Sequence, residues 1–253
     1  MKQFLCLLFL LIIPLTGFGQ NTQLFEEASK AYNEGDYETA IEKYMAILDN
    51  GEHSASLYYN LGNAHYKLNH IAPSIYYYEK ALLLAPDDPD VQNNILFARN
   101  MTLDAIEPLP QTGIARLLEK SIGKLSYNTW AIIAITAMIF FVASFLLYYF
   151  SYRRNYKRAF FIVSLSTLFL VFFSVFMGFH EYNKVQNNRP AIVFAEETLV
   201  KSEPNPNSEE VFRLHEGTKV QVLEIFQEWS KIQLADGKIG WLSTDDIKEI
   251  KTL

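Results

Sequence analysis

Side chains that commonly perform catalysis or bind metals are few in this sequence of 253 residues, and their spacing matches no catalytic motif. The histidines show neither an HExxH pattern nor a pair four residues apart, and no nucleophile lies beside an evident base. The sequence also has no glycine-rich nucleotide loop. The residues considered are Cys6, His53, His65, His70, His180 and His215. The sequence therefore predicts no enzyme, no catalytic residue, no metal site and no cofactor.

Charge and cysteine content exclude further classes of protein. A net charge of −6 argues against nonspecific nucleic-acid binding, which needs a basic surface. The single cysteine excludes a disulfide framework and a cysteine-ligated zinc site. The mean hydropathy is near zero, but it averages a very apolar stretch over residues 130–179 with polar flanks.

Candidate binding residues lie in an internal repeat of 34 residues, which aligns Asn21–Ser54 with Ala55–Asp88. The second copy has Tyr58-x2-Leu61-Gly62, followed by Tyr66, Tyr78, Ala81 and Pro86. This pattern resembles the tetratricopeptide repeat. We expect an all-α repeat domain over residues 21–106, in which a third copy supplies one capping helix from Pro89 to about Asp104. Small residues at 28 and 62 should let helices approach closely, while Tyr44 and Tyr78 fill the layer between repeats.

The resemblance implies a concave face on which tyrosine rings and amide groups hold an extended peptide. That face carries Phe25, Ser29, Tyr32, Tyr59, Asn63, Tyr66 and Lys67. The alternative is that these side chains pack on one another or on the capping helix. Residues 21–107 contain 14 acidic and 5 basic residues, a balance that favours a basic partner.

The C-terminal segment, residues 189–250, has short apolar runs separated by turn residues, which predicts a small all-β barrel. The runs are 192–194, 220–225, 230–234 and 240–242. Leu199-Val200-Lys201-Ser202-Glu203-Pro204 and Asp236-Gly237-Lys238-Ile239-Gly240-Trp241-Leu242 resemble the bacterial SH3 domain. Such domains bind peptides or cell-wall components, and Trp229 and Trp241 are the candidate ligand-binding residues. The alternative is that both indoles seal the barrel.

The chain begins with Lys2 and an apolar run over residues 4–13, followed by small residues, which predicts a signal peptide over 1–19. The alternative is an uncleaved anchor. Residues 130–150 and 159–179 are two runs of 21 residues without a charge, each long enough to cross a membrane. Four cations lie between them in 151–158, which predicts a cytoplasmic loop. We expect a basic amphipathic helix within the linker 108–129 and both flanking domains in the periplasm.

The whole layout resembles the BatE type of aerotolerance-operon protein of Bacteroidetes. This resemblance implies a non-catalytic adaptor in the bacterial inner membrane that holds protein partners, including membrane proteins with von Willebrand factor A domains, under oxidative or envelope stress. The main alternative is a sensor that binds peptidoglycan through the barrel. A transporter subunit is disfavoured because the spans contain no Asp, Glu, Lys, Arg or His.

Overall fold

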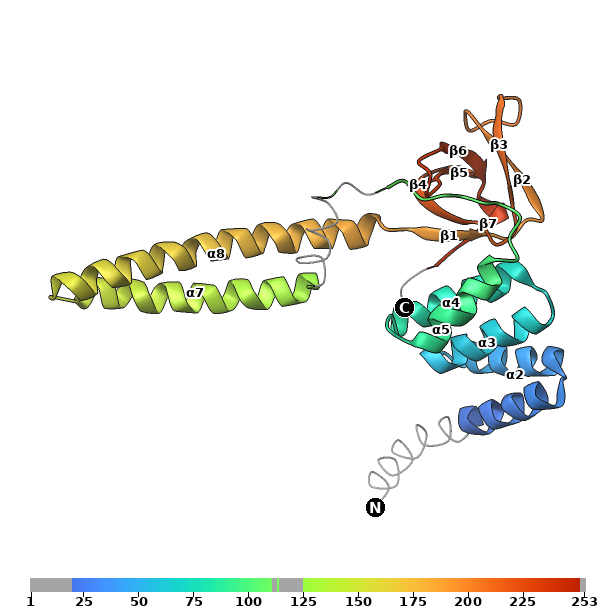
Figure 1. Cartoon of the computed structure of the whole chain (residues 1–253), viewed down its shortest axis with the longest axis horizontal. Coiled ribbons are helices and arrows are strands. Elements are labelled where there is room, and N and C mark those ends of the chain that lie inside the picture. The colour runs from blue at the N-terminus through green and yellow to red at the C-terminus, as the bar shows by residue number, and fades with distance from the viewer. Residues whose placement is uncertain (1–19, 111–112, 114–124, 251–253) are drawn as a thin grey trace, which may run out of the picture. The chain divides into compact units, whose positions relative to one another are not determined.

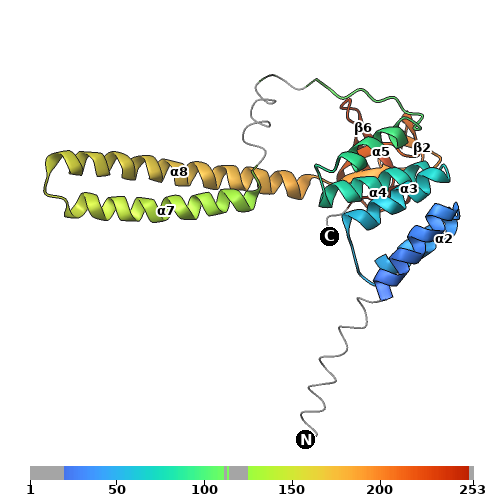
Figure 2. The same ribbon diagram turned by 60° about the horizontal axis from the view of Figure 1, so that its bottom comes forward.

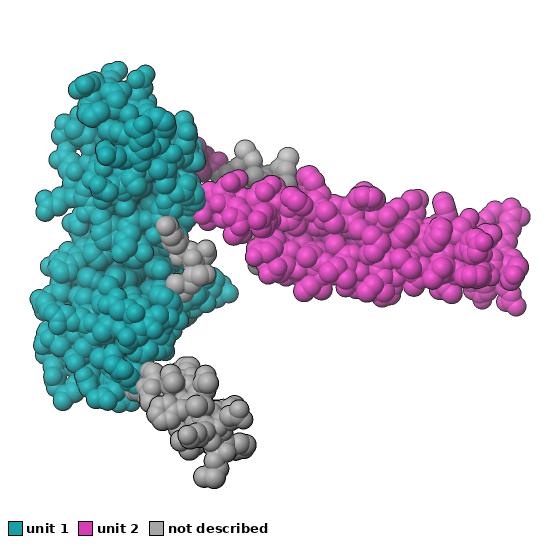
Figure 3. Space-filling model, turned by 180° about the vertical axis from the view of Figure 1, so that it is seen from behind, with its two compact units in different colours: residues 1–108, 189–253 teal, residues 109–188 magenta. Residues whose placement is uncertain are grey.

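The computed structural model describes residues 20–110, 113 and 125–250 (Figure 1). The expected signal peptide, Cys6 and most of the expected amphipathic helix lie outside the described residues. Two compact units are present, coloured separately in Figure 3. One combines the chain up to Pro108 with the chain from Arg189 onward, and the other consists of Leu109–Asn188.

The first part of the larger unit is a stack of helices, visible in Figures 1 and 2. In the described part of the repeat domain these are residues 20–34, α2 (Tyr37–Asp49), α3 (Ala55–Lys67), α4 (Ile71–Leu84) and α5 (Pro89–Arg99). Each helix from α2 to α5 packs against its neighbour in the sequence. The capping helix α5 is shorter than predicted, because it ends at Arg99 rather than near Asp104.

Local sequence signals set the helix boundaries. Gly35 and Gly51 adopt φ values of +85° and +78°, a backbone region that glycine enters at little cost, and both follow the end of a helix. Asp36 and Ser54 then cap α2 and α3, since their side chains accept hydrogen bonds from backbone N–H groups. Asp88 caps α5 in the same way.

The predicted packing roles of the small and aromatic residues are confirmed. A Cβ atom added at Gly62 would lie 2.6 Å from Cδ1 and Cε1 of Tyr78, so only glycine allows α3 and α4 this approach. Tyr44 and Tyr78 are both 1% exposed, and Ala28 is fully buried. The repeat array therefore has a close-packed interior built largely from tyrosine.

The second part of the larger unit is an antiparallel barrel-like sheet of seven strands within residues 189–250, in the order β3-β2-β6-β5-β4-β1-β7. Three of the strands, β2, β3 and β7, lie outside the predicted apolar runs. Buried side chains from alternating positions, such as Val200, Ile232 and Leu242, form its core. The strands are β1 (Pro190–Val193), β2 (Glu197–Lys201), β3 (Glu210–His215), β4 (Lys219–Phe226), β5 (Trp229–Gln233), β6 (Ile239–Ser243) and β7 (Ile247–Glu249), with a short 3₁₀ turn η1 (Thr244–Asp246) before β7.

The apolar interior of the helical repeats extends to the barrel, which also has a core of its own. Ile192 and Ile250 of the barrel are at most 5% exposed and belong to the same buried cluster as the repeat helices. The rings of Tyr76 in α4 and Phe194 after β1 meet edge to face, with centroids 5.7 Å apart. Lys248 Nζ lies 4.6 Å from the centroid of the Tyr76 ring. Residues far apart in the sequence thus form a single folded unit.

The smaller unit contains two long helices, α7 (Tyr127–Phe150) and α8 (Arg154–Asn187), which pack against each other. Both are long and apolar enough to cross a membrane. Small buried residues such as Ala134, Ala137 and Ser174 lie between them, whereas large apolar side chains such as Phe169 are exposed. Only residues 151–153 connect the helices, because Arg154 already begins α8.

Candidate functional site

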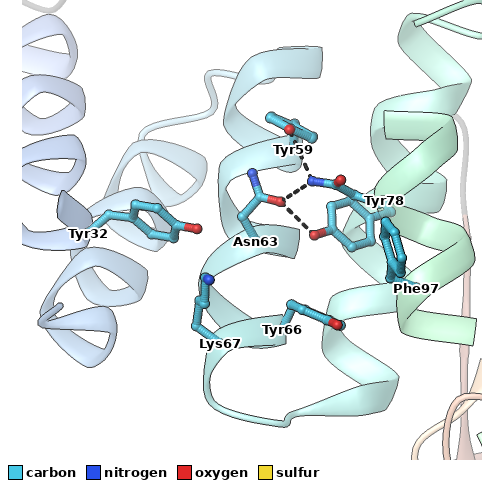
Figure 4. Close-up of a pocket in the computed structure, with 8 residues that line it drawn as sticks. Tyr32, Tyr59, Asn63, Tyr66, Lys67, Tyr78 and Phe97 are labelled. Atoms are coloured by element: carbon cyan, nitrogen blue, oxygen red, sulfur yellow. Dashed lines mark hydrogen bonds between the residues drawn. The ribbon is translucent and has the colours of Figure 1, made fainter. Parts of the chain in front are cut away.

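The main candidate site is a cavity of about 280 Å³ in the repeat domain, shown in Figure 4. Five of the seven residues expected on the concave face line it: Tyr32, Tyr59, Asn63, Tyr66 and Lys67. Tyr32 comes from the first helix, while the other four lie on successive turns of α3. Helical periodicity brings residues 59, 63, 66 and 67 to one face, which is why spacing alone could group them.

A hydrogen-bond network fixes the floor of this cavity. The Tyr78 hydroxyl donates to Asn63 Oδ1 at 2.6 Å, and Asn94 Nδ2 donates to the same oxygen at 2.9 Å. Asn94 Nδ2 also lies 3.0 Å from the Tyr59 hydroxyl oxygen, which accepts this bond. Burial raises the pKa of Tyr78 well above its ordinary value, so this hydroxyl keeps its proton and remains a donor.

The network leaves the cavity rich in hydrogen-bond donors. Both acceptor positions of Asn63 Oδ1 are occupied, and within the described residues its Nδ2 group donates to nothing. The Tyr59 hydroxyl accepts from Asn94, so its own proton is available to a ligand. Lys67 is exposed and forms no ion pair with any described carboxylate. The cavity is therefore suited to carbonyl or carboxylate oxygens, and its aromatic walls suit apolar side chains.

Phe25 and Ser29 do not join this cavity. The Phe25 ring packs on Tyr44, with centroids 5.4 Å apart, and lines a separate cavity of about 320 Å³ beside Leu57. The Ser29 hydroxyl is 3.0 Å from the Tyr44 hydroxyl, so these two groups satisfy each other. Both side chains therefore contact Tyr44 of α2, which is neither a predicted concave-face residue nor part of the capping helix.

Sequence reasoning missed three lining residues, namely Tyr78, Asn94 and Phe97. Tyr78 was assigned only to the core, yet its hydroxyl reaches the cavity floor. The repeat period of 34 residues places Phe97 at the position of Asn63, so extending the alignment into α5 would have found this residue. Asn94 lies one turn earlier on the same helix.

The second candidate site is the outer face of the barrel. In β5 and β6 the alternate residues Ser230, Ile232 and Leu242 are buried, so Trp229 and Trp241 point to the opposite face. Both indoles are partly exposed and neither belongs to the buried barrel cluster.

These two tryptophans lie on adjacent strands of one face. Lys231 pairs with Trp241 across β5 and β6, and its Nζ lies 5.6 Å from the indole centroid. The exposed Phe226 pairs with Trp229 across β4 and β5, which extends the aromatic face. The barrel therefore carries an accessible surface of aromatic rings, with Lys231 and Lys201 on the strands either side of Trp241.

Two of the five histidines, His65 and His70, lie close together. Nδ1 of His65 lies 3.2 Å from Nδ1 of His70, and the His65 ring stacks on Tyr77. Burial, with smaller contributions from nearby His70 and Lys248, lowers the pKa of His65 to about 4. Within residues 20–110 and 125–250, no three histidine, cysteine or acidic side chains are grouped to hold a metal ion.

Comparison with protein families assigns two parts of the chain. Residues 55–88 match the tetratricopeptide repeat family, and residues 198–248 match the bacterial SH3 domain family. A comparison with curated proteins finds no match. The predicted fold class, a helical repeat domain, two long apolar helices and an all-β SH3 domain, is confirmed. Both matched families are interaction domains, and no catalytic family matches the chain.

Proposed function

We propose that this protein is a non-catalytic adaptor of the bacterial inner membrane whose repeat domain holds a peptide segment of a partner protein. The observation that carries this proposal is the donor-rich cavity lined by Tyr59, Asn63 and Lys67. An extended peptide presents backbone carbonyl oxygens at regular intervals, and these accept the bonds that the cavity leaves open. Partner side chains fill the space between the tyrosine rings.

The shared core of the repeats and the barrel supports the proposed membrane topology. Tyr76, which precedes the two apolar helices in the sequence, contacts Phe194, which follows them, and this favours one compartment for both domains. A chain that leaves and returns to one side crosses the membrane an even number of times, in agreement with two spans, α7 and α8. The four cations over residues 151–158 and the N-terminal signal pattern favour the periplasm for both domains.

The order of domains supports assignment to the BatE type, with a role in aerotolerance or envelope stress. In this assignment the partners are membrane proteins with von Willebrand factor A domains. Two modest binding surfaces on one anchored unit increase the overall affinity through effective concentration. The cavity supplies the first surface, and the aromatic face around Trp229 and Trp241 supplies the second.

Site-specific photocrosslinking in membranes tests the adaptor role. A benzophenone side chain at position 66 lines the cavity without breaking the network, because Tyr66 takes no part in it. We expect a defined protein adduct, identified by mass spectrometry. Lys67→Met should reduce its yield about fivefold or more through loss of a charge-assisted hydrogen bond. Lys30→Met is the matched control, since the Lys30 side chain is 76% exposed and lies outside the cavity.

The proposal fails if position 66 yields no adduct while a benzophenone at the exposed Glu42 of α2 does. It also fails if Lys30→Met and Lys67→Met reduce the adduct equally, because the cavity would then make no specific contribution.

A peptidoglycan-binding sensor is the second candidate function, and the exposed aromatic face of the barrel favours it. Indole rings stack on the apolar faces of sugars as well as on peptides. Retention of the full chain on purified peptidoglycan, lost in Trp241→Ala but kept in the Lys30→Met control, would favour the sensor. Absence of retention, together with an adduct at position 66, would favour the adaptor.

A further inference from the structure

We infer that the barrel closes the repeat array and holds α5 in place, so that the peptide cavity depends on residues encoded beyond the membrane hairpin. The claim that the barrel holds α5 in place does not depend on any ligand. The claim that this affects peptide binding rests on the proposed function. Two acidic side chains of the repeat domain, Glu79 and Asp104, carry the argument.

Glu79 joins three elements of the larger unit. It lies in α4 and is only 8% exposed. Arg99 at the end of α5 donates to Glu79 Oε1 at 2.6 Å. Lys219 at the start of β4 donates to both oxygens of Glu79 at 2.8 Å. A carboxylate this buried requires its charged partners, so the Lys219 ammonium stabilises the geometry that also fixes the end of α5.

Asp104 provides the second link, five residues beyond the end of α5. It accepts from the backbone N–H of His215 at 2.8 Å and from the Thr218 hydroxyl at 2.6 Å. Nδ1 of His215 lies 2.8 Å from the other oxygen of Asp104. Burial alone raises the pKa of Asp104, but these hydrogen bonds outweigh it and hold the pKa below its ordinary value. The carboxylate is therefore charged and bonded at neutral pH.

The turn at Gly217 completes this contact. It has a φ of +84°, and a Cβ atom there would lie 2.8 Å from Ile71 Cγ2 and from Thr102 Cγ2. The barrel turn thus sits directly against α4 and the segment after α5, at a distance that only glycine permits.

Helix α5 connects these links to the cavity. Asn94 and Phe97 lie on α5 and line the cavity, while Arg99 ends the helix at the Glu79 cluster. Two full repeats and one helix are fewer than a repeat array usually needs to bury a continuous core. The barrel supplies the missing apolar cover through Ile192 and Ile250. Loss of the barrel contacts should therefore loosen α5 first and displace Asn94 from Asn63.

Hydrogen exchange of the full chain in lipid nanodiscs tests this inference. The double variant Lys219→Met with Asp104→Asn removes the charge from both links. We expect amides of α5 to exchange about tenfold faster or more, while amides of α2 are unchanged. The matched control is Lys238→Met with Asp236→Asn. It makes the same chemical changes at an ion pair whose two residues both belong to the barrel, with Lys238 Nζ 3.0 Å from Asp236 Oδ2. This control should leave α5 at wild-type rates.

Unchanged α5 exchange in the double variant would overturn the inference, as would an equal rise in the control. If the double variant does not accumulate, Lys219→Met alone keeps Arg99 on Glu79 and should still raise α5 exchange. The adduct at position 66 gives the ligand readout and should weaken in the double variant. A wild-type chain without an adduct would refute the proposed function, while the exchange rates would still decide the role of the barrel.

Discussion

Replacing Gly62 by alanine should damage both the packing of the repeats and the candidate cavity. The added Cβ would lie 2.6 Å from two ring carbons of Tyr78, whereas ordinary contacts at this atom are 3.4–4 Å. The ring must therefore move by about 1 Å in a close-packed interior. Because the Tyr78 hydroxyl donates to Asn63 at 2.6 Å, this movement also weakens the bond at the cavity floor.

The size of the effect follows from three contributions. Overpacking of a buried position costs about 1–3 kcal/mol. Loss of the Tyr78–Asn63 hydrogen bond costs about 1 kcal/mol more. The higher helix propensity of alanine compared with glycine offsets about 1 kcal/mol of this cost. The free energy of unfolding of the repeat domain should therefore fall by about 1–3 kcal/mol.

Hydrogen exchange of α3 and α4 in the full chain measures this change, and a double-mutant cycle with Tyr78→Ala identifies its cause. Alanine lacks Cγ, Cδ1, Cε1 and the hydroxyl, so Gly62→Ala should be nearly neutral in that background. An equal penalty in both backgrounds would refute the reasoning, because the conflict would then not involve the Tyr78 ring.

Three further predictions concern pH, the barrel and topology. The pKa of His65 is about 4 in the folded chain and 6.5 in the unfolded chain, so the unfolded chain binds the proton first as the pH falls. The free energy of unfolding of the repeats should therefore fall by about 2–3 kcal/mol between pH 6.5 and pH 4. His65→Gln should flatten this part of a stability profile measured by urea unfolding. Gly240→Ala should destabilise the barrel by about 2 kcal/mol, because the added Cβ would overlap Val200. Thermal unfolding followed by tryptophan fluorescence measures this loss, and unaltered stability would contradict the prediction. Periplasmic reporters fused after residues 106 and 253 should be active, and one fused within 151–158 should be inactive; an active loop reporter would contradict the topology.

Local sequence signals predicted the repeat helices because their causes are local. Gly35, Gly51 and Gly62 act within their own turns or on the next helix, and the period of 34 residues repeats these positions. The cavity residues of α3 were predictable for the same reason, since one helix face carries residues 59, 63, 66 and 67.

Features that depend on distant partners could not be predicted. Strand β3 reads Glu-Val-Phe-Arg-Leu-His, without strict alternation, and its pairing with β2 determines its conformation. Helix α5 was expected to continue to about Asp104, but that carboxylate bonds His215, which is 111 positions away in the sequence. Sequence periodicity does not predict a contact between residues this far apart, and the ion pair of Glu79 with Lys219 was not predictable for the same reason.

The separation of Glu79 and Lys219 also determines the order in which the protein can be completed. The two residues are 140 positions apart, and ribosomes add about 5–20 residues per second, so Lys219 is made about 7–28 s after Glu79. Helices form within microseconds, so α4 exists long before its barrel partners. Ile75 and Tyr76 remain uncovered during this interval, while the two apolar helices are being made. The newly made repeat domain is therefore most vulnerable to aggregation and proteolysis in the seconds before the barrel emerges.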